Sequence, residues 1–196
     1  MSWVTLLEAR TYIGLEDGDS TKDDVLINDA ILDGQKFLEE EIGFLFEAST
    51  QTRYYHAIDD LEEAAYGRKL RLDYPLLTVT TLTNGDGNEI PSSEYILRPV
   101  NDSPKYMIEI KRGSAYRFQY STSPESAISV EGTWGYSATC PYDVRHGLLE
   151  MIRLMYIHKD SGVLGTVSYV SGGKLVFREG LPRFILALKA RYGRKL

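Results

Sequence analysis

The stretch EGTWGYSATCPYDVRHGLLEMIRLMY, residues 131–156, decides the fold class because its periodicity changes in the middle. Up to residue 136 it continues a segment in which apolar residues such as Ile128 and Val130 alternate with other residues, as in a β-strand. After Pro141 the apolar residues recur every three or four positions, which indicates a helix, and proline suits the first helical position. The stretch therefore predicts a strand, a short junction and a long helix.

The predicted helix after Pro141 has an unusually broad apolar surface. Such breadth fits a helix buried at the centre of its own chain, and it equally fits a helix that also contacts a second subunit. One row consists of Val144, Leu148, Met151 and Met155, and a second row beside it consists of Leu149, Ile152 and Tyr156.

Three further helices are predicted on either side of this stretch. Thr5 and Glu8 form a capping box at the start of the first helix, and Gly14 is a natural stop for it. The second helix is expected to have its cap at Ser20 or Thr21, and the last is expected to begin at Pro182. The apolar stripe of the second helix consists of Ile27, Ile31, Gly34, Leu38, Ile42 and Leu45, and that of the last helix of Ile185, Leu188 and Tyr192.

Residues 50–135 have the period of strands. Alternating apolar residues predict strands at 106–110 and at 116–120, and residues 84–87 predict a tight turn between strands at 78–82 and 95–97. A further hairpin is predicted at 167–177.

The expected fold is α+β, a single domain over 1–196. A helical body of 1–49 and 136–196 is interrupted by a β module at 50–135, a small antiparallel sandwich or barrel.

Composition is that of an ordinary globular protein of 196 residues, with 43% hydrophobic and 26% charged residues. No apolar run is long enough to cross a bilayer and the start of the chain does not have the pattern of a signal peptide, so a cytosolic protein is expected. Cys140 is the single cysteine, which excludes an intrachain disulfide and a thiolate metal cluster.

Charge is distributed unevenly along the chain. The net charge is −6, yet residues 1–49 carry 12 acidic and 3 basic side chains, whereas residues 180–196 carry 5 basic and no acidic ones. The acidic part is typical of solvated helix faces. The basic end is either a binding surface for nucleic acid or an acidic protein, or an exposed terminal helix that binds nothing.

The sequence contains no arrangement of residues that is typical of an enzyme active site. The three histidines do not have metal-binding spacing, there is no G-x-S-x-G motif, and Gly173-Lys174 lacks the remaining positions of a phosphate-binding loop. Residues 86–89 lack the ligand spacing of a calcium loop. We therefore expect neither catalysis nor a metal or other cofactor.

The order of these segments resembles the head-tail connector proteins of tailed bacteriophages, which are also called adaptor or head-completion proteins. The resemblance covers nearly the whole chain and depends on the order and spacing of motifs that are individually weak. The matching features are the helix pair at 4–13 and 25–43, the segment LRLDYPLLTV at 70–79, the turn at 85–87, the strand end Trp134-Gly135-Tyr136 before Pro141, and the closing segment 181–194.

The resemblance implies a structural role without catalysis. Family members form a ring, commonly of twelve subunits, that is added beneath the portal after genome packaging. The ring extends the DNA channel and offers a platform for the next head-closure or stopper protein. DNA would pass through without sequence-specific binding, and the protein would be located in the virion neck after assembly in the host cytoplasm.

Two groups of candidate site residues follow from this resemblance together with the charge and periodicity described above. The basic last helix is expected to dock to an acidic surface of the portal, with aromatic residues as anchors. The broad helix after Pro141 and the hairpin are expected to contact neighbouring subunits. The portal-docking candidates are Arg183, Phe184, Lys189, Arg191, Tyr192, Arg194 and Lys195, and the inter-subunit candidates are Val144, Leu148, Met151, Met155, Tyr169 and Phe177.

Two other classes of function are compatible with the sequence. The aromatic residues of the β module and the basic end could belong to a small nucleic-acid- or ligand-binding β module with added helices, although alternating aromatic residues are also favoured by any half-buried strand. A hydrolase of unrecognised type is the third class. Salt-dependent binding to DNA would separate the second class from the connector.

Overall fold

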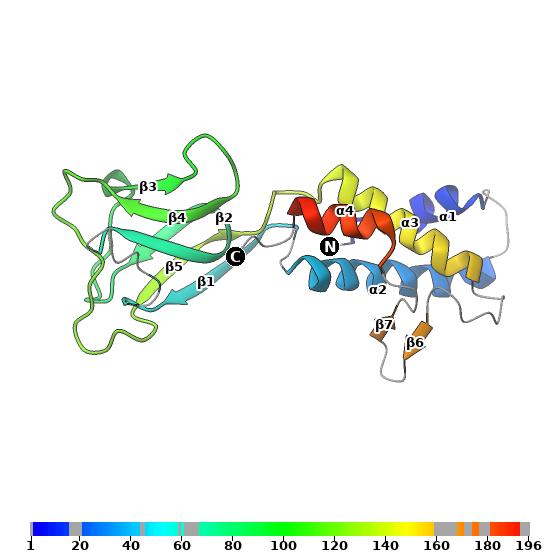
Figure 1. Ribbon diagram of the computed structural model, residues 1–196, viewed down its shortest axis with the longest axis horizontal. Helices are drawn as coiled ribbons and strands as arrows, with labels where there is room; N and C mark the ends of the chain where they lie inside the picture. The colour runs from blue at the N-terminus through cyan, green and yellow to red at the C-terminus, as the bar shows by residue number, and fades with distance from the viewer. Residues whose placement is uncertain are drawn as a thin grey trace. The chain divides into compact units, whose positions relative to one another are not determined.

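The computed structural model describes residues 2–15, 21–43, 46–58, 60, 67–158, 168–170, 174–176 and 181–192. Figure 1 labels the elements along the chain. The helices are α1 (Leu6–Ile13), α2 (Asp24–Ile42), α3 (Tyr142–His158) and α4 (Arg183–Tyr192). The strands are β1 (Ser49–Tyr55), β2 (Lys69–Thr83), β3 (Tyr95–Arg98), β4 (Lys105–Ile110), β5 (Ile128–Trp134), β6 (Ser168–Val170) and β7 (Lys174–Val176).

The chain divides into two compact units. Met1–Gly43 and Cys140–Leu196 form the first, which we call the helical unit, and Phe44–Thr139 forms the second, which we call the β unit. The divisions fall within a few residues of those expected from the change of periodicity. Whether the two units fold as one domain stays a prediction.

The ends of α1 and α2 follow local sequence rules. Thr5 Oγ1 accepts a hydrogen bond from the Glu8 amide at 3.3 Å, and the Thr5 amide donates to Glu8 Oε2 at 2.9 Å, so the predicted capping box is confirmed. Gly14 ends α1 in the left-handed region at φ 91°. The cap predicted for α2 is wrong at Thr21, which lies in a 3-10 turn. Asp23 occupies the N-cap, and its carboxylate makes no capping hydrogen bond but accepts one from the Tyr156 hydroxyl at 3.0 Å. Ser20 and Leu45 lie outside the described residues.

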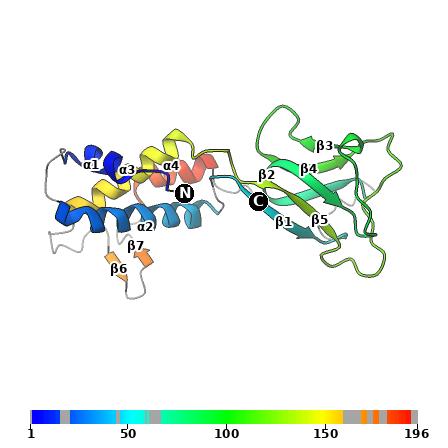
Figure 2. The same cartoon turned by 180° about the vertical axis from the view of Figure 1, so that it is seen from behind.

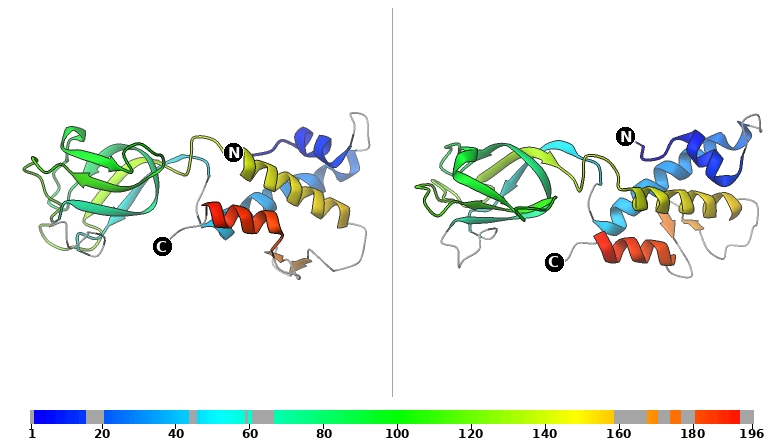
Figure 3. Two further views of the ribbon diagram at one scale, coloured as in Figure 1. Left: turned by 45° about the horizontal axis from the view of Figure 1, so that its top comes forward. Right: turned by 90° about the horizontal axis from the view of Figure 1, so that it is seen from above.

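Packing of α2 against α3 forms the core of the helical unit. Figure 2 shows the four helices from behind, and Figure 3 shows α1 and α4 on opposite sides of α3. Each of these two helices packs on both α2 and α3. Gly34 allows the close approach, because a Cβ there would lie 2.7 Å from Leu148 Cδ1. The buried residues of α2 are Ile27, Ala30, Ile31, Gly34, Leu38 and Ile42, which confirms the predicted stripe at these positions.

The β unit contains a five-stranded antiparallel sheet with the order β1-β5-β2-β4-β3. Among the described strands, β1 pairs only with β5 and β3 only with β4, so the sheet is not closed into a barrel. The α+β class and the antiparallel β module are confirmed, and closure into a barrel is the part of that prediction that is wrong. In the helical unit, β6 and β7 pair antiparallel, as expected of the hairpin.

Strand β2 changes its partner along its length. Its first part pairs with β4 and its second part with β5, and the ladders shift register at several points. Pro75 lies where the partner changes, and the absence of an N–H group is tolerated at such an interruption. Trp134 is fully buried at the end of β5, where its Nε1 donates to the Gln51 carbonyl at 3.0 Å.

The segment 116–120, which was predicted to be a strand, is irregular apart from one isolated bridge between Gly85 and Tyr120. The buried side chain of Asn84 takes the place of a neighbouring strand. Its Nδ2 donates to the Arg117 carbonyl at 2.8 Å and its Oδ1 accepts from the Gln119 amide at 3.1 Å. The tight turn at 84–87 does form, since the Gly87 amide donates to the Asn84 carbonyl at 2.9 Å.

Candidate functional site

The exposed side of α3 carries a row of aromatic, apolar and basic residues. Tyr142 is 80% exposed and Ile157 is 55% exposed, and both His146 and Arg153 between them are also exposed. The four positions are separated by four, seven and four residues, so they lie on one face of the helix. We call these four residues the α3 outer row.

A second helix strengthens this surface through Tyr12 of α1. The Tyr12 hydroxyl donates to Glu150 Oε1 at 2.5 Å, and its ring meets the edge of His146 at 5.7 Å between centroids. Burial and the Glu150 carboxylate raise the pKa of Tyr12 to about 12, so the hydroxyl keeps its proton at neutral pH. The Tyr142 ring stacks parallel to His146 at 6.5 Å.

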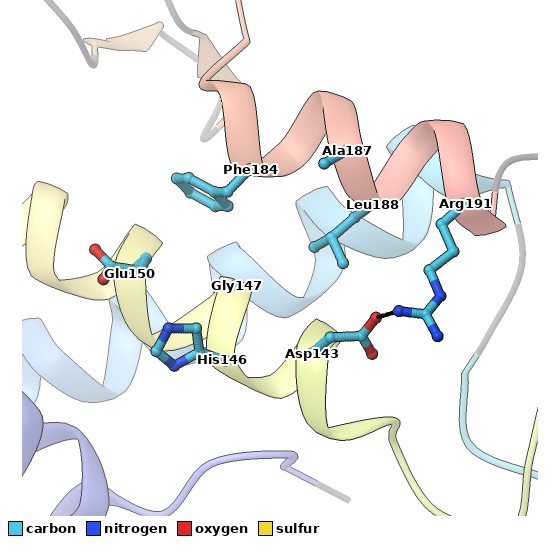
Figure 4. A pocket seen from close by; sticks show the side chains of 8 residues that line it. All are labelled: Asp143, His146, Gly147, Glu150, Phe184, Ala187, Leu188 and Arg191. Carbon is cyan, nitrogen blue, oxygen red and sulfur yellow. Dashed lines mark hydrogen bonds and ion pairs between the residues drawn. The ribbon is translucent and has the colours of Figure 1, made fainter.

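A groove of about 440 Å³ lies between α3 and α4 beside the α3 outer row. Figure 4 shows Phe184 and Leu188 reaching from α4 toward α3, with the ion pair of Asp143 and Arg191 at one end. Gly147 keeps the two helices close, because a Cβ there would lie 2.7 Å from Leu188 Cδ1. The groove is lined by Asp143, His146, Gly147, Glu150, Phe184, Ala187, Leu188 and Arg191.

Asp143 holds the end of α4 against α3. The Tyr192 hydroxyl donates to its two carboxylate oxygens at 2.7 and 2.8 Å, and Arg191 Nη1 lies 3.0 Å from Oδ2. On the other side of α4, Lys189 Nζ lies 2.9 Å from Glu41 Oε2 on α2. The basic helix is therefore partly neutralised by acids of its own unit.

These contacts give the portal-docking candidates different environments. Lys189 and Arg191 are exposed but ion-paired, and Tyr192 is buried with its hydroxyl on Asp143. Arg183 is exposed and Phe184 is half-buried in the groove. The remaining two candidates, Arg194 and Lys195, lie outside the described residues.

The inter-subunit candidates on α3 lie inside the helical unit. Val144, Leu148 and Met151 are fully buried, and Met155 is nearly so. The row therefore has a role in the core of its own chain, and a role between subunits stays a prediction. Tyr169 belongs to β6, and Phe177 lies outside the described residues.

Sequence periodicity pointed to the buried side of α3 and missed its exposed side. The signal was present, because Tyr142 and Ile157 are large apolar residues on the face opposite the buried row. Their row also contains His146 and Arg153, so it does not form an uninterrupted apolar stripe.

The exposed side of α2 carries a comparable row that is acidic instead of basic. Val25 is 72% exposed and Leu32 is 61% exposed, and Asp29 lies exposed between them. Lys36 and Glu40 continue the row and are 4.0 Å apart. We call these five residues the α2 outer row.

The β unit contains a cluster of polar and aromatic groups around Arg53. Its guanidinium lies 3.9 Å from the centroid of the Tyr74 ring and 3.0 Å from Asp73 Oδ2. The Tyr55 hydroxyl donates to Asp73 Oδ1 at 2.8 Å, and burial together with this carboxylate raises the pKa of Tyr55. These contacts connect β1 to β2, and the face of the Tyr74 ring packs against the guanidinium of Arg53. Among the described tyrosines of this unit, four are exposed and come from β1, β4 and the segment after β4: Tyr54, Tyr106, Tyr116 and Tyr120.

Two absences concern the part of the chain that the structure describes. No three His, Cys, Asp or Glu side chains there come together as ligands for a metal ion. Likewise, none of the described helices has both the length and the apolar character needed to span a membrane.

Comparison with known proteins gives matches among solved structures. No protein-family model and no curated protein matches the sequence. A chain in the neck of an empty gene transfer agent (GTA) particle, computed with C6 symmetry, is 18% identical with a TM-score of 0.57, and the match covers 99% of this chain and 92% of that one. A chain in the virion of a native GTA particle is 16% identical with a TM-score of 0.60 and the same two coverages.

A third match is to a chain in the neck of the native GTA particle, computed with C12 symmetry. It is 16% identical with a TM-score of 0.54, and the match covers 97% of this chain and 90% of that one. At such low identity the likeness concerns the fold. The chain thus has, over nearly its whole length, the fold of chains that occur in these gene transfer agent assemblies.

Proposed function

We propose that the protein is a structural component of the neck of a phage or phage-like particle. The observation that carries this proposal is the match of helical and β units together, over 99% of this chain, to chains in GTA necks and virions. A match confined to one unit would have supported only a common small fold. The role is non-catalytic: the protein is a piece of the channel between head and tail.

The proposed assembly is a ring of identical subunits, twelve in number. The similar neck chains lie in assemblies computed with C6 and C12 symmetry, which supports a cyclic arrangement. Such a ring would dock beneath the portal, extend the DNA channel and offer a platform for the head-closure protein. DNA would pass through it without sequence-specific contacts.

Helix α4 is the proposed portal-docking element. Its exposed Arg183 supplies a basic group at the start of the helix for an acidic surface of the portal. Lys189, Arg191 and Tyr192 hold the helix on α2 and α3 and so fix its orientation. In this scheme Arg194 and Lys195 extend the basic surface.

Electron microscopy of the protein with and without the portal of its particle tests the function. The expected result is a ring of twelve subunits on the portal and weak association without it. Subunits that the portal holds side by side have a high effective concentration for one another, so a weak contact between them suffices. Absence of any complex with the portal would overturn the proposal. Strong DNA binding that weakens with salt would instead favour the nucleic-acid-binding module.

A point substitution tests the docking element better than removal of α4, because Ile185 and Leu188 of that helix are buried. Arg183→Glu should weaken sedimentation with portal rings more at low than at high ionic strength, since exposed charges are screened by salt. Arg112→Glu, at an exposed arginine of the β unit, is the matched control. Equal binding of Arg183→Glu and the control would place the docking surface elsewhere.

A further inference from the structure

The two outer rows lie on opposite sides of the α2–α3 pair. Ile31 and Leu38 of α2 and Leu148 of α3 belong to the buried sides of these helices, and Gly34 allows the two to approach closely. The α2 outer row and the α3 outer row therefore face away from each other. A cyclic ring needs this property, because each subunit must offer one surface to the neighbour on one side and a different surface to the other.

The two surfaces complement each other in charge. Of the charged residues in the α2 outer row, Asp29 and Glu40 are acidic and Lys36 is basic. The α3 outer row contains Arg153 and His146 and no acid. Of the two carboxylates beside it, Asp143 is ion-paired with Arg191, and Glu150 accepts a hydrogen bond from Tyr12.

The two surfaces also differ in shape. On α2, Val25 and Leu32 project from a helix face and are 72% and 61% exposed. Beside the α3 outer row, the groove between α3 and α4 is hollow and has Phe184 and Leu188 on its α4 side. A projecting aliphatic ridge fits a partly apolar hollow, whose lining also contains Asp143, Glu150 and Arg191.

From these observations we infer that, in the ring, the α2 outer row of one subunit packs against the α3 outer row and the α3–α4 groove of the next subunit. The occupant is a second copy of this chain. The inference rests on the ring assembly proposed above and adds which surfaces form its contact. Tyr142, Ile157, Val25 and Leu32 become buried, and Asp29 and Arg153 set the register.

Single substitutions on the two rows test the contact in the full-length protein with portal rings. Leu32→Asp and Ile157→Asp each place a charge in the contact, and each should lower the yield of closed rings by about tenfold or more. Leu7→Asp, at an exposed leucine of α1 outside both rows, should form rings like the wild type. Because these side chains are more than half exposed, all three variants should keep the wild-type melting temperature within a few degrees.

Crosslinking distinguishes two different surfaces from one surface that meets itself. In a Cys140→Ser background, Leu32→Cys and Ile157→Cys chains are assembled separately and as a mixture, then treated with a bismaleimide. Crosslinked dimers should form in the mixture and not in either preparation alone. Dimers in a single-variant preparation would show that like surfaces meet and would overturn the inference.

The outcomes also separate this inference from the proposed function. If both Asp variants form normal rings, the inferred contact is wrong, and the proposed neck function is not affected. A wild-type protein that forms no ring on the portal would overturn the function and the contact together.

Discussion

Gly132 is a residue of β5 at which the backbone of β2 leaves no room for a side chain. A Cβ at this position would lie 2.1 Å from the Thr78 carbonyl oxygen, in a part of β2 where the register shifts. We expect Gly132→Ala to lower the free energy of unfolding of the β unit by about 1–3 kcal/mol, because backbone cannot move aside as a side chain can. Thermal and urea unfolding measure the effect.

Gly113→Ala is the matched control for that substitution. Gly113 lies in an exposed turn and has nothing within 4 Å of the Cβ position, so its replacement should change stability by less than about 0.5 kcal/mol. Equal stabilities of the two alanine variants would mean that β2 does not press on β5 at Gly132.

Glu8 makes the stability of the helical unit depend on pH. A hydrogen bond from Arg145 and one from the Thr5 amide hold the pKa of Glu8 at about 2, below its ordinary 4.5. Because the folded-state pKa is the lower one, this stabilisation is complete above pH 4.5 and is lost as the pH falls toward 2. Since both side chains are partly exposed, the contribution is about 1 kcal/mol or less.

Glu8→Gln should therefore flatten the fall in melting temperature between pH 4.5 and pH 2. Above pH 5 the variant should be slightly less stable than the wild type, and near pH 2 the two should melt together. If the melting temperatures of both proteins fall in parallel as the pH is lowered, the ion pair of Glu8 and Arg145 does not contribute to stability.

Asn84 shows why some residues could not be assigned from the sequence. Tyr116, Phe118 and Tyr120 alternate as strand residues do, and Phe118 is indeed buried between two exposed tyrosines. The backbone of the residues between them, Arg117 and Gln119, is however hydrogen-bonded by the Asn84 side chain, more than thirty positions earlier. Periodicity reports which side is buried, whereas the partner of the backbone depends on contacts distant in sequence.

At the scale of elements, the carboxylate of Asp143 holds the end of α4. Tyr192→Phe removes both hydroxyl contacts to Asp143, at a cost of about 1–2 kcal/mol for a bond to a charged acceptor. Amide hydrogen exchange along α4 should then accelerate by about tenfold, while exchange in α2 and in the β unit stays unchanged. Tyr142→Phe, at an exposed tyrosine of α3, should leave exchange in α4 as it is.

The helices could be predicted more completely than the sheet. Capping residues and the stripe of α2 are encoded within a few residues of each other, so the ends of α1 and the buried side of α2 followed from the sequence. The strand order could not be read, because β1 and β5 pair across more than seventy residues and β2 pairs with two partners. Likewise, the groove of the candidate site could not be predicted, because it depends on how α4 packs on α3.

At the scale of the whole molecule, the β unit is an insertion between the two halves of the helical unit. It has its own core, which includes Leu70, Ile108 and Trp134. We expect a fragment of residues 44–139 to fold alone and to unfold cooperatively. In a longer fragment of residues 1–139, Ile27 and Leu38 of α2 lack their partners on α3, so α2 should not be stably folded.

Amide chemical shifts distinguish these cases. The fragment 44–139 should give dispersed signals, and the fragment 1–139 should give the same signals together with poorly dispersed ones from α1 and α2. A fragment 44–139 without dispersed signals would show that the two units fold only together.

The insertion also sets an order of events during synthesis. The ribosome completes the β unit before it has made α3, so that unit can fold on the nascent chain while α1 and α2 wait for their partners. The α3 outer row and the groove beside it exist only after α4 has left the ribosome. Chains from which α4 has not yet emerged therefore present no finished surface to one another, and assembly begins only after the whole helical unit has left the ribosome.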